Sequence, residues 1–256
     1  MYQLLQYLKF LCTATNQHGV HSPFVYDLVT QCFYAKTDKD IASQLKAYRN
    51  ALLSKTETLT ITDYGAGSKR YRTNQRSVKQ IVRTSGTSMK RARFMFRIVN
   101  YLKPKHILEL GTSLGIATQA MALGNPEAHI VSIEGCPHIS NTAKQQLDQF
   151  QMHGVNLKSG AFESHLPTLK NQQWDLVFFD GNHQKAATLQ YFEQLLPTAH
   201  NGTVFIFDDI YWSKAMTEAW NMMAQHPKVS VTVDTFHWGL VFFKKELTKE
   251  NFKIRV

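Results

Sequence analysis

Cysteine is scarce in this chain, and long apolar runs are missing. The three cysteines (Cys12, Cys32 and Cys136) are widely spaced and odd in number, which argues against a disulfide framework or a paired-cysteine metal knuckle. No stretch approaches eighteen uninterrupted apolar residues, so no transmembrane helix is predicted. We therefore expect a reduced, cytoplasmic protein without a membrane span.

The first twelve residues are mildly apolar but do not resemble a secretory signal. Gln3, Gln6 and Lys9 interrupt the apolar positions, which follow helical spacing, and no small-residue cleavage site follows. This pattern predicts an amphipathic helix. Hydrophobic residues make up 43% of the chain and aromatic residues 12%, which excludes a disordered chain and favours one with a substantial core.

Acidic residues are missing from one long segment. Between Tyr64 and Leu108 the chain carries twelve lysines and arginines and no aspartate or glutamate, within a formal net charge of +10. Repulsion among like charges costs stability unless a partner offsets it. The segment favours an anionic partner, and a phosphorylated or acidic substrate, RNA and anionic lipid all stay open; a solvated basic face is the alternative.

The pattern of elements changes near residue 104. Before it, helices are expected at 2–14, after Ser22-Pro23, at 38–54 and at 88–101, with a polar, glycine-containing segment at about 62–87. After it, five apolar runs alternate with helical segments, and two further runs close the series without a helix between them. The runs span 106–110, 129–134, 155–158, 174–180, 203–209, 229–234 and 240–243.

This alternation predicts an α/β fold with a doubly wound, mostly parallel, seven-stranded sheet and one antiparallel strand among the last two. We expect a helical, basic N-terminal extension at 1–85 and a ligand-binding domain at 86–256. Ligands of such sheets bind beyond the carboxyl ends of the strands.

Two acidic residues stand at those ends. The first strand runs into segment 109–115 (ELGTSLG), and Glu134 ends the second strand. A glycine turn before a helix suits a close backbone approach to a ligand, and a carboxylate at the second strand end can accept both hydroxyls of a ribose. Ser113 occupies the position of the middle glycine in a dinucleotide motif, so the pattern favours the cationic S-adenosylmethionine over a nicotinamide dinucleotide.

From about Thr87 to Phe243 the chain resembles class I S-adenosylmethionine-dependent methyltransferases of the catechol and caffeoyl-CoA O-methyltransferase type. The resemblance is carried by 86–89 (GTSM), 107–118 (ILELGTSLGIAT), Ile133-Glu134, 159–161 (SGA), 174–183 (WDLVFFDGNH) and 202–212 (GTVFIFDDIYW). Segment 18–24 (HGVHSPF) also looks like the extension of a group of bacterial methyltransferases.

The resemblance implies a set of cofactor contacts. Glu109, Gly111, Thr112, Ser113 and Gly115 would line the methionine part of S-adenosylmethionine. Glu134 would hold the ribose, and Asp180 would lie beside the sulfonium and the substrate. Gly160, Ala161 and Phe162 would cover the adenine. Ser113 as a helix N-cap, and Ala161 and Phe162 as plain core residues, are the structural alternatives.

In the metal-dependent branch of this family, an aspartate after the fourth strand and an Asp-Asn pair after the fifth hold Mg²⁺. Asp180 matches the first ligand, and Asp208-Asp209 stands in place of the pair, so the resemblance implies Mg²⁺ or another divalent cation. A simple helix-capping role for Asp208 and Asp209 is the alternative.

The same family places a lysine as general base three residues after the first metal aspartate, where this chain has His183. Asp180, His183 and Asp208 are thus the expected catalytic residues, and Lys185 is the nearest substitute for His183 as base. Segment 63–68 (DYGAGS) mimics a cofactor turn but lacks the following apolar helix, so a loop that brings Arg70 and Arg72 to an anionic acceptor is preferred.

The expected function is O-methylation of a small hydroxylated acceptor. The basic segment would suit an acceptor that is also anionic. An RNA methyltransferase that uses segment 64–108 is one alternative, and a non-catalytic binding protein of the same fold is another. Asp180 is followed by Gly-Asn-His rather than by the motif of adenine N-methylation, which weakens the RNA alternative. A homodimer is compatible with the sequence.

Overall fold

The computed structural model describes residues 1–62 and 74–256, which form two compact units. One unit combines 1–34 with 166–256, and the other spans 35–165. Helix α8 (Phe162–Leu169) contains the second boundary between them. The expected division into 1–85 and 86–256 stays a prediction.

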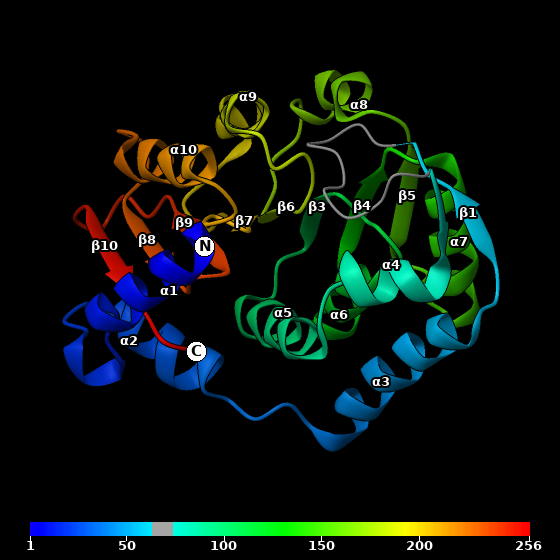
Figure 1. Cartoon of the computed structure of the whole chain (residues 1–256). Coiled ribbons are helices and arrows are strands. Elements are labelled where there is room, and N and C mark those ends of the chain that lie inside the picture. Colours follow the sequence, from blue (N-terminus) through cyan, green and yellow to red (C-terminus); the bar gives the residue numbers. More distant parts are fainter. Residues whose placement is uncertain (63–73) are drawn as a thin grey trace. The chain divides into compact units, whose positions relative to one another are not determined.

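The unit spanning 35–165 contains a parallel three-stranded sheet in the order β3-β4-β5 (Figure 1). Its elements are α3 (Lys39–Ser54), β1 (Thr58–Thr60), β2 (Gln75–Ser77), α4 (Val78–Thr84), α5 (Met89–Leu102), β3 (His106–Leu110), α6 (Ile116–Gly124), β4 (His129–Glu134), α7 (Pro137–Gln149) and β5 (Val155–Ser159). The predicted strands are confirmed.

Two parts of this unit were missed by the sequence pattern. The segment expected to be polar contains α4, which begins at a capping box formed by Ser77 and Gln80. Strand β2 was also missed, and it pairs antiparallel outside the main sheet with β1, which lies within a possible strand at 58–62. The three-residue length of β2 is too short to show an alternation of apolar and polar residues.

The other unit contains five strands in the order β10-β8-β9-β7-β6. Its elements are α1 (Tyr2–Thr13), a 3₁₀ turn at Gln17–Gly19, α2 (Pro23–Asp27), a π-helical turn at Leu28–Phe33, β6 (Leu176–Phe179), α9 (Lys185–Leu195), a 3₁₀ turn at Leu196–Thr198, β7 (Val204–Asp208), α10 (Lys214–Gln225), β8 (Val231–Asp234), β9 (Trp238–Phe242) and β10 (Glu250–Lys253). β9 runs antiparallel to β7 and to β8, as predicted for one of the last two strands.

Apart from the β1–β2 pair, the described residues contain eight strands where seven were expected, because β10 adds one. It pairs parallel with β8, although only its Phe252 is partly buried, so its sequence carries almost no apolar signal. The α/β, mostly parallel character of the fold is confirmed. Among the residues that the structure describes, no helix is both long enough and apolar enough to span a membrane.

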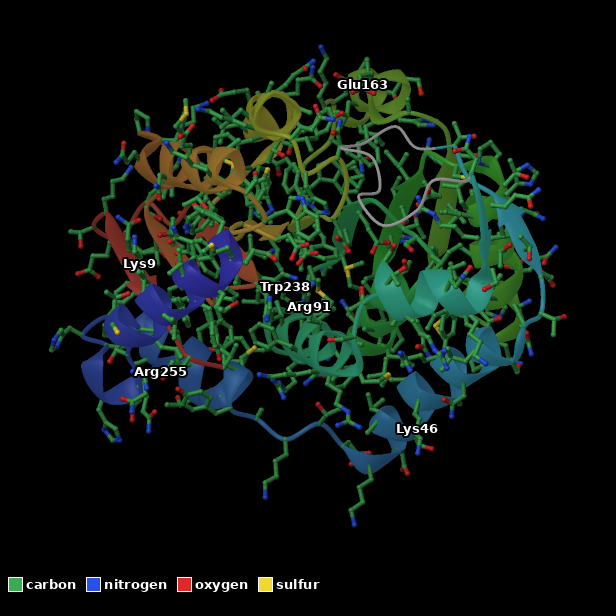
Figure 2. The ribbon with its side chains drawn as sticks, viewed as in Figure 1. Lys9, Lys46, Arg91, Glu163, Trp238 and Arg255 are labelled. Carbon is green, nitrogen blue, oxygen red and sulfur yellow. The ribbon has the colours of Figure 1, made fainter. Side chains whose placement is uncertain are left out.

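Hydrogen bonds join the C-terminal end of the chain to the end of helix α1 in this unit. The Arg255 guanidinium, labelled in Figure 2, donates to the carbonyls of Leu11 at 2.9 Å and Ala14 at 3.0 Å. Ala14 follows directly after α1, whose Phe10 is buried near Phe236. The predicted N-terminal helix therefore packs against the loop between β8 and β9 of its own unit.

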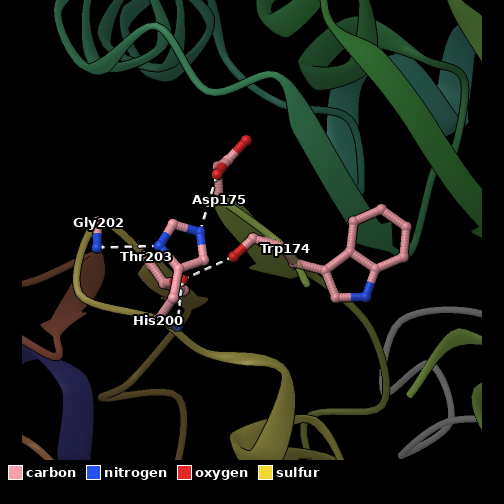
Figure 3. A network of polar contacts seen from close by, with 5 residues as sticks. All are labelled: Trp174, Asp175, His200, Gly202 and Thr203. Carbon is pink, nitrogen blue, oxygen red and sulfur yellow. Dashed lines mark hydrogen bonds and ion pairs between the residues drawn. The ribbon is translucent and has the colours of Figure 1, made fainter. Parts of the chain in front are cut away.

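A polar network fixes the amino ends of β6 and β7 (Figure 3). The Gly202 amide donates to Nδ1 of His200 at 3.1 Å, which leaves the proton on Nε2 to donate to Asp175 at 2.9 Å. The Thr203 hydroxyl donates to the Trp174 carbonyl at 2.7 Å. These contacts set where both strands begin, and hence where their carboxyl ends lie.

One glycine limits the packing of α10 on the sheet. A Cβ added to Gly239 in β9 would overlap the ring carbons of Trp220, which is only 5% exposed. We expect Gly239→Ala to lower the free energy of unfolding by about 1–3 kcal/mol, because a rigid indole cannot move aside. Urea unfolding of Gly239→Ala, Trp220→Leu and the double variant measures this. The alanine should cost less in the Trp220→Leu background, and equal costs in both backgrounds would contradict the clash.

Candidate functional site

The turn after β3 is built on left-handed backbone conformations. Gly111 has φ 108°, Ser113 φ 49° and Gly115 φ 76°, and Gly115 is the N-cap of α6. A Cβ on Gly115 would lie 2.5 Å from the hydroxyl oxygen of Tyr48, a fully buried residue of α3. That hydroxyl donates to the Leu114 carbonyl at 3.0 Å, so α3 supports the turn from behind. Because the N-cap is Gly115, the N-cap alternative for Ser113 is wrong.

Glu109 is a fully buried acid held by two hydroxyl groups. Its Oε2 accepts from Thr118 of α6 and from Ser132 of β4, both at 2.5 Å, and Ser132 is its register partner on the neighbouring strand. Its Oε1 is buried and has no hydrogen-bond partner among the described residues. Burial raises the pKa of Glu109 to about 7, the Ser132 and Thr118 hydroxyls lower it, and the charge of Glu134 adds to the rise.

Glu134 at the end of β4 is oriented by backbone amides. Its Oε2 accepts from the Ser113 amide at 2.8 Å, and its Oε1 accepts from the Cys136 amide at 2.9 Å. The carboxylate thereby joins the glycine turn after β3 to the loop after β4. It is partly exposed.

The loop after β5 contributes the three residues expected to cover adenine. Gly160 has φ 131°, and its amide donates to the Glu134 carbonyl at 2.9 Å, which places this loop against the end of β4. Ala161 and Phe162 are only partly buried. Their reading as plain core residues is therefore not supported.

Three supporting residues of this part of the site were not predicted. Ser132 and Thr118 hydrogen-bond Glu109, and Tyr48 lies under the glycine turn. Ser132 is a polar residue inside an apolar strand, which is a usable signal in the sequence. Tyr48 lies on a helix more than sixty residues before the turn, so no local pattern links the two.

The carboxyl ends of β6 and β7 bring together three of the predicted residues. Asp180 follows β6, Asp208 ends β7, and these strands pair parallel in register. Ligand atoms of Asp180, His183 and Asp208 all lie within 4.8 Å of one another, with His183 Nε2 at 4.0 Å from Asp180 Oδ1. Asp208 is 6% exposed, whereas Asp180 and His183 are partly exposed.

Asp209 and Lys185, which were also considered for this site, make different contacts. Asp209 has φ 51°, and among the described residues it is not part of the convergent group. The N-cap of α10 is Ser213, whose hydroxyl accepts from the Met216 amide, so the capping role considered for Asp208 and Asp209 is wrong. Lys185, the alternative base, donates to Glu218 of α10 at 2.9 Å.

The basic segment is only partly described. Its residues 74–108 include Lys79 and Arg83, which share one exposed face of α4, and Lys90 and Arg93, which are exposed on α5. Figure 2 labels Arg91 of α5 and Lys46 of α3, a helix that packs against α4 and α5. The DYGAGS loop with Arg70 and Arg72 lies outside the described residues, so its expected role stays a prediction.

Residues 108–210 match a family model described as a methyltransferase domain. The chain is 24% identical to a catechol O-methyltransferase of Mycobacterium tuberculosis over 159 residues, which is 57% of this chain and 71% of that protein. It is 26% identical to a catechol O-methyltransferase of Niastella koreensis over 128 residues, which is 48% of this chain and 57% of that protein.

Solved structures agree on the fold. An O-methyltransferase from Bacillus cereus, in complex with SAH, superposes with a TM-score of 0.57 at 18% identity, over 86% of this chain and 96% of that one. These comparisons support a class I S-adenosylmethionine-dependent O-methyltransferase of the catechol type. They confirm the predicted fold class and support the predicted family and cofactor.

The buried acid of this methyltransferase predicts a pH-dependent stability. Because folding raises the pKa of Glu109 from 4.5 to about 7, the folded state binds more protons between these values. Stability from this group is complete below pH 4.5 and is lost as the pH rises through about 7, by on the order of 3 kcal/mol. Urea unfolding between pH 5 and 8 should show this decline in the wild type and a flatter profile in Glu109→Gln. Parallel profiles would refute the assignment.

Proposed function

We propose that this S-adenosylmethionine-dependent O-methyltransferase acts on a small molecule with neighbouring hydroxyl groups and that a divalent cation assists it. The names of the two catechol O-methyltransferases support this acceptor class. The carboxylates of Asp180 and Asp208, which converge beside His183, support the cation. Three free cysteines support a reaction in the reducing cytoplasm.

The observation that carries the cofactor assignment is the unsatisfied oxygen of Glu109. A buried carboxylate oxygen without a donor is costly, and a cationic ammonium group offsets that cost by charge and hydrogen bonding together. S-adenosylmethionine carries such a group on its methionine part. We therefore assign Glu109 to the ammonium, with Gly111, Thr112, Ser113 and Gly115 lining the methionine chain.

Glu134 is assigned to the ribose hydroxyls. Two amides hold its carboxylate in one orientation, which reduces the entropy lost when it accepts hydroxyl donors. Gly160, Ala161 and Phe162 are assigned to the adenine, and the partial exposure of Ala161 and Phe162 supports that role.

Asp180 and Asp208 are assigned to the divalent cation, and Asp180 also to the acceptor. The cation would supply Lewis acidity that lowers the pKa of an acceptor hydroxyl, which prepares it to displace the methyl group from a sulfonium. The protein residues would hold the acceptor oxygen in line, and positioning supplies much of the rate of such a displacement. Asp209 as a further ligand and His183 as general base stay proposals from the resemblance.

The basic segment supports an anionic acceptor. Exposed Lys79, Arg83, Lys90 and Arg93 carry charge without a carboxylate between them in the sequence, which favours binding of an anion. We favour a small carboxylated or phosphorylated acceptor over RNA, because the curated relatives are catechol O-methyltransferases. A homodimer stays a prediction.

If Glu134 binds the ribose, removing its carboxylate should abolish the difference in affinity between S-adenosylhomocysteine and its 2′-deoxy analogue. Calorimetry with S-adenosylhomocysteine and its 2′-deoxy analogue, on wild type and Glu134→Ala, separates the hydroxyl contact from general damage. The wild type should bind the deoxy analogue about 10-fold more weakly, because a hydrogen bond to a charged group is worth about 1.5–3 kcal/mol. Glu134→Ala should bind both ligands equally and weakly. Retained discrimination between them would exclude the assignment.

The acceptor assignment predicts a preference among isomers. The protein should form S-adenosylhomocysteine with 1,2-dihydroxybenzoates but not with 1,3-isomers, because only adjacent oxygens chelate one cation. Removal of metal should slow the reaction at least about 100-fold, since a bound dication supplies several kcal/mol. Full activity after chelation would remove the cation from the proposal, and methylation of RNA alone would replace the small acceptor.

A further inference from the structure

The residue at position 183 changes the donor chemistry of the carboxylate site. The resemblance to the metal-dependent O-methyltransferases implies a lysine there, and a protonated lysine has no lone pair to offer a metal. A neutral histidine has one, on a nitrogen that metals bind readily. In this chain that nitrogen lies 4.0 Å from Asp180 Oδ1 and within 4.8 Å of a carboxylate oxygen of Asp208.

These separations suit coordination of a single ion. Bonds from a first-row metal to nitrogen or oxygen ligands are about 2.1 Å long, so two ligands of one ion lie at most about 4.2 Å apart. The His183–Asp180 distance is within this limit. The remaining approach requires only side-chain rotation, which the partly exposed Asp180 and His183 allow while the buried Asp208 stays in place.

The backbone holds His183 at this place. Asn182 adopts a left-handed conformation with φ 50°, and the Gln184 amide donates to its carbonyl at 2.6 Å, which closes a tight turn around His183. The Asn182 side chain donates to the Tyr191 hydroxyl on α9 at 3.2 Å. The histidine is thus on an anchored turn beside two carboxylates, and all of these residues belong to the same unit.

We propose that His183 is a metal ligand, and that Asp180, His183 and Asp208 form a two-carboxylate, one-imidazole centre for a late first-row dication such as Co²⁺ or Zn²⁺ rather than Mg²⁺. Mg²⁺ prefers oxygen ligands, whereas imidazole favours the later metals of the first row. The inference rests on the proposed function, since it concerns the same centre. It also removes His183 as general base, because the lone pair that would accept a proton is used in coordination.

The test is the metal selectivity of untagged, metal-free, full-length protein, without cofactor or acceptor. Calorimetric titrations with CoCl₂ and MgCl₂ compare the wild type with His183→Gln and His226→Gln. Glutamine offers a neutral oxygen in place of the nitrogen, so the ratio of Co²⁺ to Mg²⁺ affinity should fall at least about 10-fold in His183→Gln. His226, a partly buried histidine beside Glu193 in the same unit, is the matched control and should leave the ratio unchanged.

The visible absorption of bound Co²⁺ in the wild type gives a second measurement that needs no variant to fold, because its bands report nitrogen ligation. A preference for Mg²⁺ in the wild type, an unchanged ratio in His183→Gln or an all-oxygen Co²⁺ spectrum would each overturn the inference.

S-adenosylhomocysteine affinity, measured on the same samples, separates this failure from failure of the proposed function. Tight binding with an unchanged metal ratio overturns the role of His183 alone. A changed metal ratio without S-adenosylhomocysteine binding supports His183 as a ligand and overturns the methyltransferase assignment of the site.

Discussion

Parallel strand pairing is the constraint on which both candidate sites depend. Neighbouring parallel strands bring their carboxyl ends to the same edge, so residues far apart in the chain meet there without any local contact between them. The β3–β4 ladder aligns Glu109 with Ser132, and Glu134 follows directly after the last paired residue of β4. The β6–β7 ladder does the same for Asp180 and Asp208. A slip of one residue in either ladder would turn these side chains to the opposite face.

The acids at the two strand edges, Glu109 and Asp180, differ in how far they are removed from water. Glu109 is removed from water completely, and two hydroxyl donors recover only part of the lost hydration. Asp180 keeps part of its exposure and lies beside a histidine. The first arrangement stores unfavourable free energy that a cationic ligand relieves, and the second keeps its donors accessible to an ion that arrives with its own water. A cation that binds at Glu109 would therefore gain free energy because the carboxylate has already lost its water on folding.

The sequence predicted the elements that carry a strong local signal. The buried strands and the residues at their ends follow from apolar runs that stop at glycine or aspartate, and Glu109, Glu134, Asp180 and Asp208 were found in this way. Strands β2 and β10 were not predicted because they are short and largely exposed. The contacts of Thr118 and Ser132 with Glu109 depend on the register between elements. The grouping of His183 with both aspartates was expected only from the family resemblance, because the left-handed turn that holds His183 leaves no signal in the composition.

Tyr48 shows that the glycine turn is not a property of the methyltransferase motif alone. Its hydroxyl fills the space that a side chain at position 115 would need, and it bonds the carbonyl of Leu114. Two glutamines anchor the same helix, since Gln119 donates to the Gln44 carbonyl and Gln146 donates to the Tyr48 carbonyl. Helix α3 therefore acts as a template for the glycine turn. Exchanging helix α3 between relatives would change the shape of that turn, even though no residue of the helix belongs to the motif.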